Sequence, residues 1–291
     1  MKISAAILMT IAVFAAAFIK APEVSAESYC GKLEYIICGD SAVITGYENS
    51  PVTLDIPCRI DGKAVSAVRE NAFYKCGSLK SVTLPDTVTS IGHHAFSGCT
   101  ALESAVINGS ITLIDEGCFS GCTSLCKISL PDSIREIGKN SFYKCINLGR
   151  LELPESLEVI DENAFCGCGS LESIRLPNRL LKVGDKAFYA CTKLTEVHIP
   201  DSTAELGSRA FGYIDGARRK VNGFTLTGGR SSLGKAYAAD NGFGYKAADT
   251  CGTAEIPTVP TTVAILSGAG LMFLFILSKM RHLRFRYEYE R

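Results

Sequence analysis

Apolar residues recur through the middle of the chain with a fixed period of 23 residues. Each copy places an aliphatic residue five positions before a phenylalanine, and most copies place a leucine six positions after it. The phenylalanines are Phe73, Phe96, Phe119, Phe142, Phe165, Phe188 and Phe211. A period kept without insertion indicates stacked structural repeats, in which each coil covers the apolar face of its neighbour. We therefore assign these phenylalanines to the repeat core.

Each copy also predicts two short strands. In SVTLP (81–85) the alternation points Val82 and Leu84 inward and Thr83 outward, and the proline ends the strand. A second apolar run follows, such as SIREI (133–137), before the segment with the phenylalanine returns the chain. The fold expected is a repeat solenoid of 23-residue coils, mainly β, whose compact third side consists of short helical or turn segments.

The repeat resembles a known family. Residues 125–145, LCKISLPDSIREIGKNSFYKC, are similar to the BspA-type, or Treponema pallidum-type, leucine-rich repeat. On this resemblance 69–223 hold the repeats, 27–68 form a strand-rich N-terminal segment, and 224–246 form a closing segment with a short helix. The resemblance implies a leucine-rich-repeat-like solenoid and a cell-surface protein that adheres to host matrix proteins or other cells.

The last coil departs from the repeat, because Tyr213 and Ile214 replace its Gly-Cys pair. Terminal repeats of solenoids commonly differ from internal ones because they act as caps. We therefore expect Phe211, near this end, to contribute less stability than the central Phe142.

The outward strand positions form the candidate binding surface. If successive strands stand side by side, these positions align in a ladder across the coils. The ladder contains Thr83, Val106, Ser129, Glu152, Arg175 and His198, and it is flanked by Ser81, Ser104, Lys127, Arg150, Ser173 and Glu196. Its mixed chemistry suits an extracellular protein or glycan partner. An envelope enzyme on a repeat scaffold and a purely structural envelope protein remain as alternatives.

No catalytic or metal-binding constellation is evident. His93 and His94 occupy slots that hold other polar residues in other coils, so they are expected to be exposed turn residues. His198 lies on an outward strand position without an evident partner. The sequence contains no nucleophile elbow, phosphate-binding glycine loop or H-E-x-x-H motif. We therefore expect no enzymatic activity, no metal and no cofactor.

The thirteen cysteines form three groups: six in the repeat column, the local variants Cys118, Cys126 and Cys166, and four outside the column. Six follow the repeat period and are expected to be buried, reduced thiols, because cysteine packs as a small hydrophobic residue. Their clusters Cys118/Cys122/Cys126 and Cys166/Cys168 overlap this column, which disfavours a zinc site. The better candidates for disulfide bonds lie outside the column: Cys30, Cys38, Cys58 and Cys251.

The charge and the two ends of the chain indicate its compartment. Lysine plus arginine and aspartate plus glutamate number 30 each, which argues against a nucleic-acid partner. Residues 1–26 are typical of a secretory signal peptide. After a linker at 247–260, residues 261–278 are uncharged and long enough to cross a bilayer. The basic tail, 279–291, predicts that the chain is single-pass in the cell membrane with the repeats outside.

An alternative anchor precedes the apolar span. VPTTV (259–263) resembles the L-P-x-T-G sorting signal of wall-anchored bacterial surface proteins, with Pro260 and Thr262 matching. Val259 replaces the leucine and Val263 replaces the glycine that flanks the cleaved bond. We therefore favour a retained membrane helix over attachment to the wall by sortase.

Overall fold

A computed structural model describes residues 28–30, 33–215, 219–229 and 232–247. The chain divides into two units, 1–249 and 250–291, and every described residue belongs to the first. The predicted signal peptide, transmembrane helix and basic tail lie outside the described residues. Among the described residues, no helix has the length and apolar character needed to cross a membrane.

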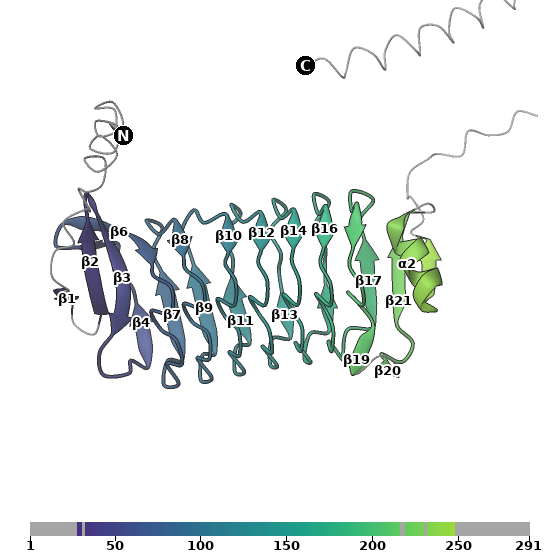
Figure 1. The fold of residues 1–291 in the computed structure, drawn as a ribbon, viewed down its shortest axis with the longest axis horizontal. Helices are drawn as coiled ribbons and strands as arrows, with labels where there is room; N and C mark the ends of the chain where they lie inside the picture. The colour runs from purple at the N-terminus through teal and green to yellow at the C-terminus, as the bar shows by residue number, and fades with distance from the viewer. Residues whose placement is uncertain (1–27, 31–32, 216–218, 230–231, 248–291) are drawn as a thin grey trace, which may run out of the picture. The chain divides into compact units, whose positions relative to one another are not determined.

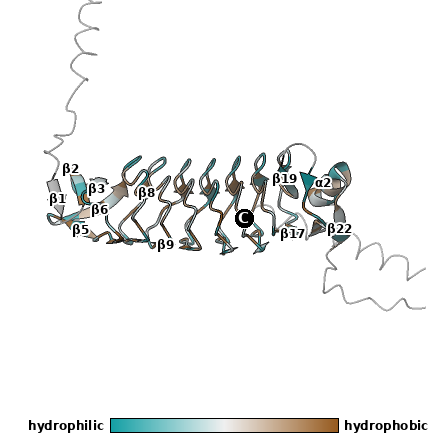
Figure 2. Ribbon diagram, turned by 90° about the horizontal axis from the view of Figure 1, so that it is seen from below, coloured by the Kyte–Doolittle hydropathy of each residue, from teal (hydrophilic) through white to brown (hydrophobic). Residues whose placement is uncertain are grey.

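The described residues form a solenoid whose coils carry parallel strands on two sides, as the repeat predicts (Figure 1). One side of the coils, which we call the strand face, holds strands of two to four residues: β4 (Thr53–Asp55), β7 (Ser81–Leu84), β9 (Ser104–Ile107), β11 (Lys127–Ser129), β13 (Arg150–Leu151), β15 (Ser173–Ile174), β17 (Glu196–Ile199), β21 (Thr225–Gly228) and β22 (Gly244–Ala247). The second side holds two-residue strands: β8 (Ser90–Ile91), β10 (Leu113–Ile114), β12 (Glu136–Ile137), β14 (Val159–Ile160), β16 (Lys182–Val183) and β18 (Glu205–Leu206). Hydrophobic and hydrophilic stretches alternate around each coil (Figure 2).

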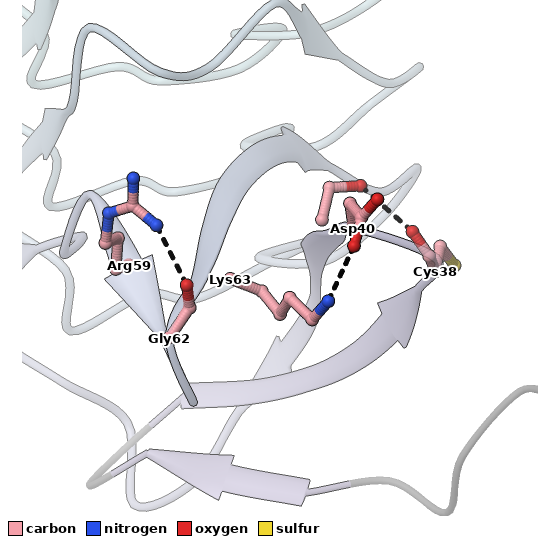
Figure 3. Close-up of polar contacts among 6 residues, drawn as sticks. Cys38, Asp40, Arg59, Gly62 and Lys63 are labelled. Carbon is pink, nitrogen blue, oxygen red and sulfur yellow. Dashed lines mark hydrogen bonds and ion pairs between the residues drawn. The ribbon is translucent and has the colours of Figure 1, made fainter.

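The N-terminal segment is a sheet of antiparallel and parallel strands that starts the stack. It contains β1 (Ser28–Cys30), β2 (Leu33–Cys38), β3 (Ser41–Tyr47), β5 (Arg59–Ile60) and β6 (Lys63–Val68), and β8 of the next coil pairs with β6. Polar contacts hold its turns: Lys63 pairs with Asp40 at 2.7 Å and Arg59 donates to the carbonyl of Gly62 at 2.8 Å (Figure 3). The Lys63 hydrogen bond and charge lower the pKa of Asp40.

The phenylalanines of the repeat stack into one continuous spine. All seven are 0–1% exposed, and neighbouring ring centroids lie 4.8–5.5 Å apart with interplanar angles of 1–16°. The spacing matches the distance between adjacent strands of a sheet, about 4.8 Å. Tyr47 of β3 stacks on the first ring at 5.6 Å, so the N-terminal sheet extends the spine.

The third side of each coil is a series of tight turns, which we call the turn face. Its backbone groups pair from coil to coil, as where Phe73 N–H donates to the carbonyl of Ala95 at 2.8 Å. The residues two positions before the phenylalanines all have φ of 53–61°: Asn71, His94, Gly117, Asn140, Asn163, Lys186 and Arg209. This left-handed conformation suits asparagine and glycine, which explains their frequency at this slot.

Buried thiols complete the backbone pairing of the spine. The Sγ of Cys99 donates to the carbonyl of Phe73 in the preceding coil at 3.1 Å, and Cys122, Cys145, Cys168 and Cys191 repeat this contact at 3.1–3.3 Å. Cysteine thus supplies a small apolar body together with a donor, which explains why the repeat keeps it. All eleven described thiols are free, including those of Cys38 and Cys58, which sequence analysis offered as disulfide candidates.

A helix and two hairpin strands close the C-terminal end. After β19 (Tyr213–Asp215) and β20 (Arg219–Lys220), α2 (Leu233–Asn241) packs over the last ring and leads into β22. Tyr237 lies edge-on to Phe211, with ring centroids 6.5 Å apart. Phe211 is 0% exposed, as is Phe142, so we now expect comparable stability losses at the two positions.

At this end the hydroxyl group of Tyr237 makes the hydrogen bonds that a following coil makes elsewhere in the stack. The Phe211 N–H donates to the Tyr237 hydroxyl oxygen at 3.1 Å, and that hydroxyl donates to the Phe211 carbonyl at 3.2 Å. In internal coils these two backbone groups pair with a carbonyl and a thiol of the following coil. The Tyr237 side chain therefore satisfies both groups where the next coil is missing.

Tyr237→Phe is expected to lower the free energy of unfolding by about 1–3 kcal/mol, because two buried backbone groups lose their partner. Urea melts of the full chain measure this change. Tyr74→Phe serves as the control. Tyr74 is 45% exposed, so this substitution should change the free energy of unfolding by less than about 0.5 kcal/mol. Equal changes in the two variants would contradict the assigned role of Tyr237.

The same hydroxyl predicts a dependence on pH. Burial raises the pKa of Tyr237 from 10.0 to about 12. Between these values the unfolded phenol loses its proton while the folded one keeps it, so this contribution to stability is present below pH 10 and falls as the pH rises. The stability difference between the wild type and Tyr237→Phe should therefore narrow as the pH rises from 10 to about 12.

Native-state alkylation should separate the two kinds of thiol. Burial raises the pKa of Cys145 and Cys191 well above the usual value of 9.0, so neither forms the reactive thiolate at pH 8.5. Iodoacetamide should modify the exposed Cys58 and Cys126 in the folded chain and reach the column thiols only in urea. Mass spectrometry of the digested protein locates the label, and early labelling of Cys145 would refute a closed core.

Candidate functional site

The structure places the predicted binding ladder on the strand face, where successive strands stand in register. Thr83 pairs with Val106, and Val106 pairs with Ser129, so their side chains form a row across β7, β9 and β11. Glu152 and Arg175 follow the ends of β13 and β15, which pair with each other. Thr83 and Val106 are half-buried, whereas Ser129, Glu152, Arg175 and His198 are exposed.

The strand face is not one sheet. β4, β7, β9 and β11 form the first, β13 and β15 the second, and β17, β21 and β22 the third. The central strands are also shorter, with three residues in β11 and two in β13 against four in β7 and β9. Strand pairing is therefore shorter in the central coils, and the surface is hollowed beside β11, β13 and β15.

Two adjoining hollows occupy this opening, and we call them together the central groove. One has a volume of about 430 Å³ and is lined by Cys126, Lys127, Ile128, Ser129, Leu130, Arg150 and Glu152. The other has a volume of about 460 Å³ and is lined by Arg150, Leu151, Glu152, Leu153, Glu155, Ser173 and Arg175. Arg150 and Glu152 line both hollows, so the groove runs continuously across three coils.

The central groove combines an apolar floor with charged walls. Leu130 and Leu153 are only partly buried against the core and contribute apolar surface. Arg175 forms an ion pair with Glu155 at 3.0 Å, and both side chains remain mostly exposed. Because cationic and anionic side chains both line it, the groove offers partners for each kind of charge on a bound polypeptide.

Sequence reasoning found the charged positions of the groove and missed others. Glu155 was not among the residues singled out from the sequence, and its pairing with Arg175 was not foreseen. Leu130 and Leu153 occupy strand positions that the alternation points inward. They are only partly buried, whereas the equivalent Leu176 of the next coil is 3% exposed.

The histidines lie away from the central groove. The Nδ1 atom of His198 lies 3.1 Å from the Thr227 hydroxyl of β21, so His198 has a partner that sequence analysis did not identify. His93 is exposed and its Nδ1 lies 3.1 Å from a carboxylate oxygen of Asp115 in the next coil. Within the described part of the chain, no three histidine, cysteine or acidic side chains are grouped so that they could hold a metal ion.

Comparison with known families agrees with the repeat architecture. The profile of the BspA type leucine rich repeat region matches residues 66–178 and 158–219, with six copies, and together these ranges exceed half of the chain. This match confirms the resemblance that the sequence motif indicated. No curated protein sequence matches the chain at a significant level.

Several solved structures of bacterial leucine-rich repeat proteins are similar to this chain. The leucine rich repeat protein of T. pallidum is 28% identical, with 76% of this chain and 98% of that chain covered and a TM-score of 0.44. A leucine rich cell surface protein from Faecalibacterium prausnitzii is 21% identical, with 73% of each chain covered and a TM-score of 0.47. A leucine-rich repeat protein from Bacteroides ovatus is 20% identical, with 76% of each chain covered and a TM-score of 0.35.

Proposed function

The chain belongs to the BspA-type leucine-rich repeat family, and on that premise we propose that it is a membrane-anchored extracellular adhesion module. In this proposal the central groove of the strand face binds an extended segment of an extracellular protein. The observation that supports it most directly is the continuous groove shared by the two hollows at Arg150 and Glu152.

The chemistry of the groove favours a polypeptide partner. An extended peptide rises about 3.3 Å per residue, so a few residues of it would cross the three coils that line the groove. Its apolar side chains would cover Leu130 and Leu153, while its charged side chains would meet Arg150 and Glu152. Since the walls carry both signs of charge, the groove would select partners by the order of their charges more than by net charge.

A binding role also accounts for the surface better than catalysis does. Burial raises the pKa of Cys145 and Cys191 well above the usual value, and both thiols lie in the core and line none of the described hollows. A protonated, enclosed thiol is a poor nucleophile. The exposed Cys126 donates its S–H to the Glu103 carbonyl at 3.2 Å, which gives it a role in holding the coils together.

The test is a binding measurement on the full chain, immobilised and exposed separately to purified extracellular-matrix proteins, glycans and wall polymers. Saturable binding of a matrix protein supports the proposal. Binding of a glycan alone would replace the protein partner with a sugar, and no binding to any of the three classes would favour a purely structural envelope protein.

Changing Glu152 and Arg175 together to alanine should weaken binding of such a protein at least about tenfold, which corresponds to 1.4 kcal/mol. The double variant should melt within a few degrees of the wild type, because both side chains are exposed. The control replaces Lys139 and Glu162, an exposed ion pair outside the strand face at 2.8 Å, and should leave affinity unchanged. Equal losses in the two double variants would reject the central groove as the site.

Anchoring is the second part of the proposal. The uncharged stretch 261–278 and the lysine and arginine residues after it support a single membrane span with the repeats outside. The departures of VPTTV from the sorting motif, at Val259 and Val263, favour retention of this span over transfer to the cell wall.

A tag placed after Arg291 distinguishes the two anchors. In a retained span, the tag and the repeats should remain together in the membrane fraction of the expressing cells. Sortase cleavage would separate the tag from repeats that are covalently bound to the wall, and an untagged repeat domain in the wall fraction would therefore overturn the proposal.

A further inference from the structure

A hollow on the turn face carries chemistry that the strand face does not use. It has a volume of about 450 Å³ and is lined by Asn140, Tyr143, Asn163, Cys166, Lys186, Tyr189 and Arg209. This volume falls within the range of small-molecule sites, about 300–1,000 Å³. Its lining belongs to four consecutive coils and shares no residue with the central groove.

The hollow exists because one coil carries a small residue where its neighbours carry large ones. The slot directly after the spine phenylalanine holds Tyr143, Cys166 and Tyr189 in three successive coils. These coils are 5.2 and 5.1 Å apart at the spine, so the two tyrosines start about 10 Å apart with only the half-buried Cys166 between them. A tyrosine at 166 would occupy this space.

Polar and cationic side chains form the other wall. Asn140, Asn163, Lys186 and Arg209 occupy the left-handed slot of successive coils. Neither Lys186 nor Arg209 forms an ion pair with a described residue. No carboxylate lines the hollow.

Glu162 and Asp185, which directly precede Asn163 and Lys186 in the chain, have partners. Glu162 pairs with Lys139 at 2.8 Å and accepts from the amide of Asn163 at 3.2 Å. Asp185 accepts from the N–H of Ser208 at 2.7 Å. On the other side, the Nζ of Lys144 lies 5.2 Å from the centre of the Tyr143 ring and adds a further positive charge. The hollow is therefore electropositive, with aromatic rings at its edge.

We propose that this hollow binds a carboxylate-bearing ring of an acidic saccharide. The apolar face of a sugar ring packs against an aromatic side chain, which Tyr143 and Tyr189 supply. The amides of Asn140 and Asn163 can both donate to and accept from sugar hydroxyl groups. Lys186 and Arg209 supply charge-assisted hydrogen bonds to the carboxylate.

A ring-shaped ligand suits this hollow better than a polypeptide does. Four coils contribute to its lining, but the space left at Cys166 lies between Tyr143 and Tyr189, so its two aromatic walls face each other across a single coil. The central groove, by contrast, is continuous across its two hollows and accommodates an extended chain. The two faces are thus assigned different partner classes.

The test measures binding of tetragalacturonate to the full chain by titration calorimetry. The neutral tetrasaccharide cellotetraose and a peptide of four glutamates are titrated for comparison. The acidic saccharide should bind more tightly than either. Equal binding of the neutral sugar would overturn the role of the cations, and equal binding of the peptide would overturn the saccharide assignment.

Two variants locate the site, and each introduces a residue type that other coils already carry at the same slot. Cys166→Tyr fills the hollow with the residue that both neighbouring coils carry, and it should abolish binding. Lys186→Asn with Arg209→Asn removes both cations but keeps a residue that tolerates the left-handed slot, and it should lower affinity at least about tenfold.

The controls introduce tyrosine and asparagine at the corresponding slots two or more coils away. Ser120→Tyr and His94→Asn occupy the corresponding slots but do not line the hollow. Both controls should bind tetragalacturonate as the wild type does. If binding is absent in the wild type, persists in Cys166→Tyr and in the double variant, or falls equally in the controls, the proposal is wrong.

Discussion

The coil-to-coil step of about 5 Å governs the structure. Because 23 residues complete one coil, each side chain lies beside the side chain at the same slot in the next coil. A residue type that packs well against itself, such as phenylalanine, can then be used in every coil, and the spine from Tyr47 to Phe211 is the result. The same step brings Lys139 to Glu162 and Arg135 to Glu158, so ion pairs also run between coils.

The second constraint is that buried backbone N–H and C=O groups need hydrogen-bond partners, and it explains residues that packing alone does not. A coil leaves polar groups on each of its faces, and the next coil must pair with them. The thiol of Cys99 does so in the core by donating to the Phe73 carbonyl. At the C-terminal end the Tyr237 hydroxyl serves the same backbone groups of Phe211, so a side chain ends a stack that would otherwise require another repeat.

The fold was predictable because the period of the sequence equals the period of the structure. The slots of Phe142 and Leu148 hold phenylalanine and leucine in every central coil, so the burial of these side chains follows from the repetition. The central groove and the hollow on the turn face depend instead on departures from the repeat. The shortening of β13 and the small Cys166 between two tyrosines belong to single coils, and the volume they leave depends on how neighbouring side chains extend. The ladder positions were therefore foreseeable, whereas the central groove was not.

The left-handed turn slot limits the surface chemistry that this architecture can acquire. Every coil needs a residue there whose side chain tolerates positive φ, and the slot holds asparagine, glycine, histidine, lysine or arginine in this chain. Valine, isoleucine and threonine are disfavoured by their branched Cβ. A family built on this turn can diversify that row of its surface by exchanging amides, imidazoles and cations with little effect on the fold. The turn slot can thus carry different polar side chains for recognition, whereas branched apolar side chains are expected at other positions of the coil.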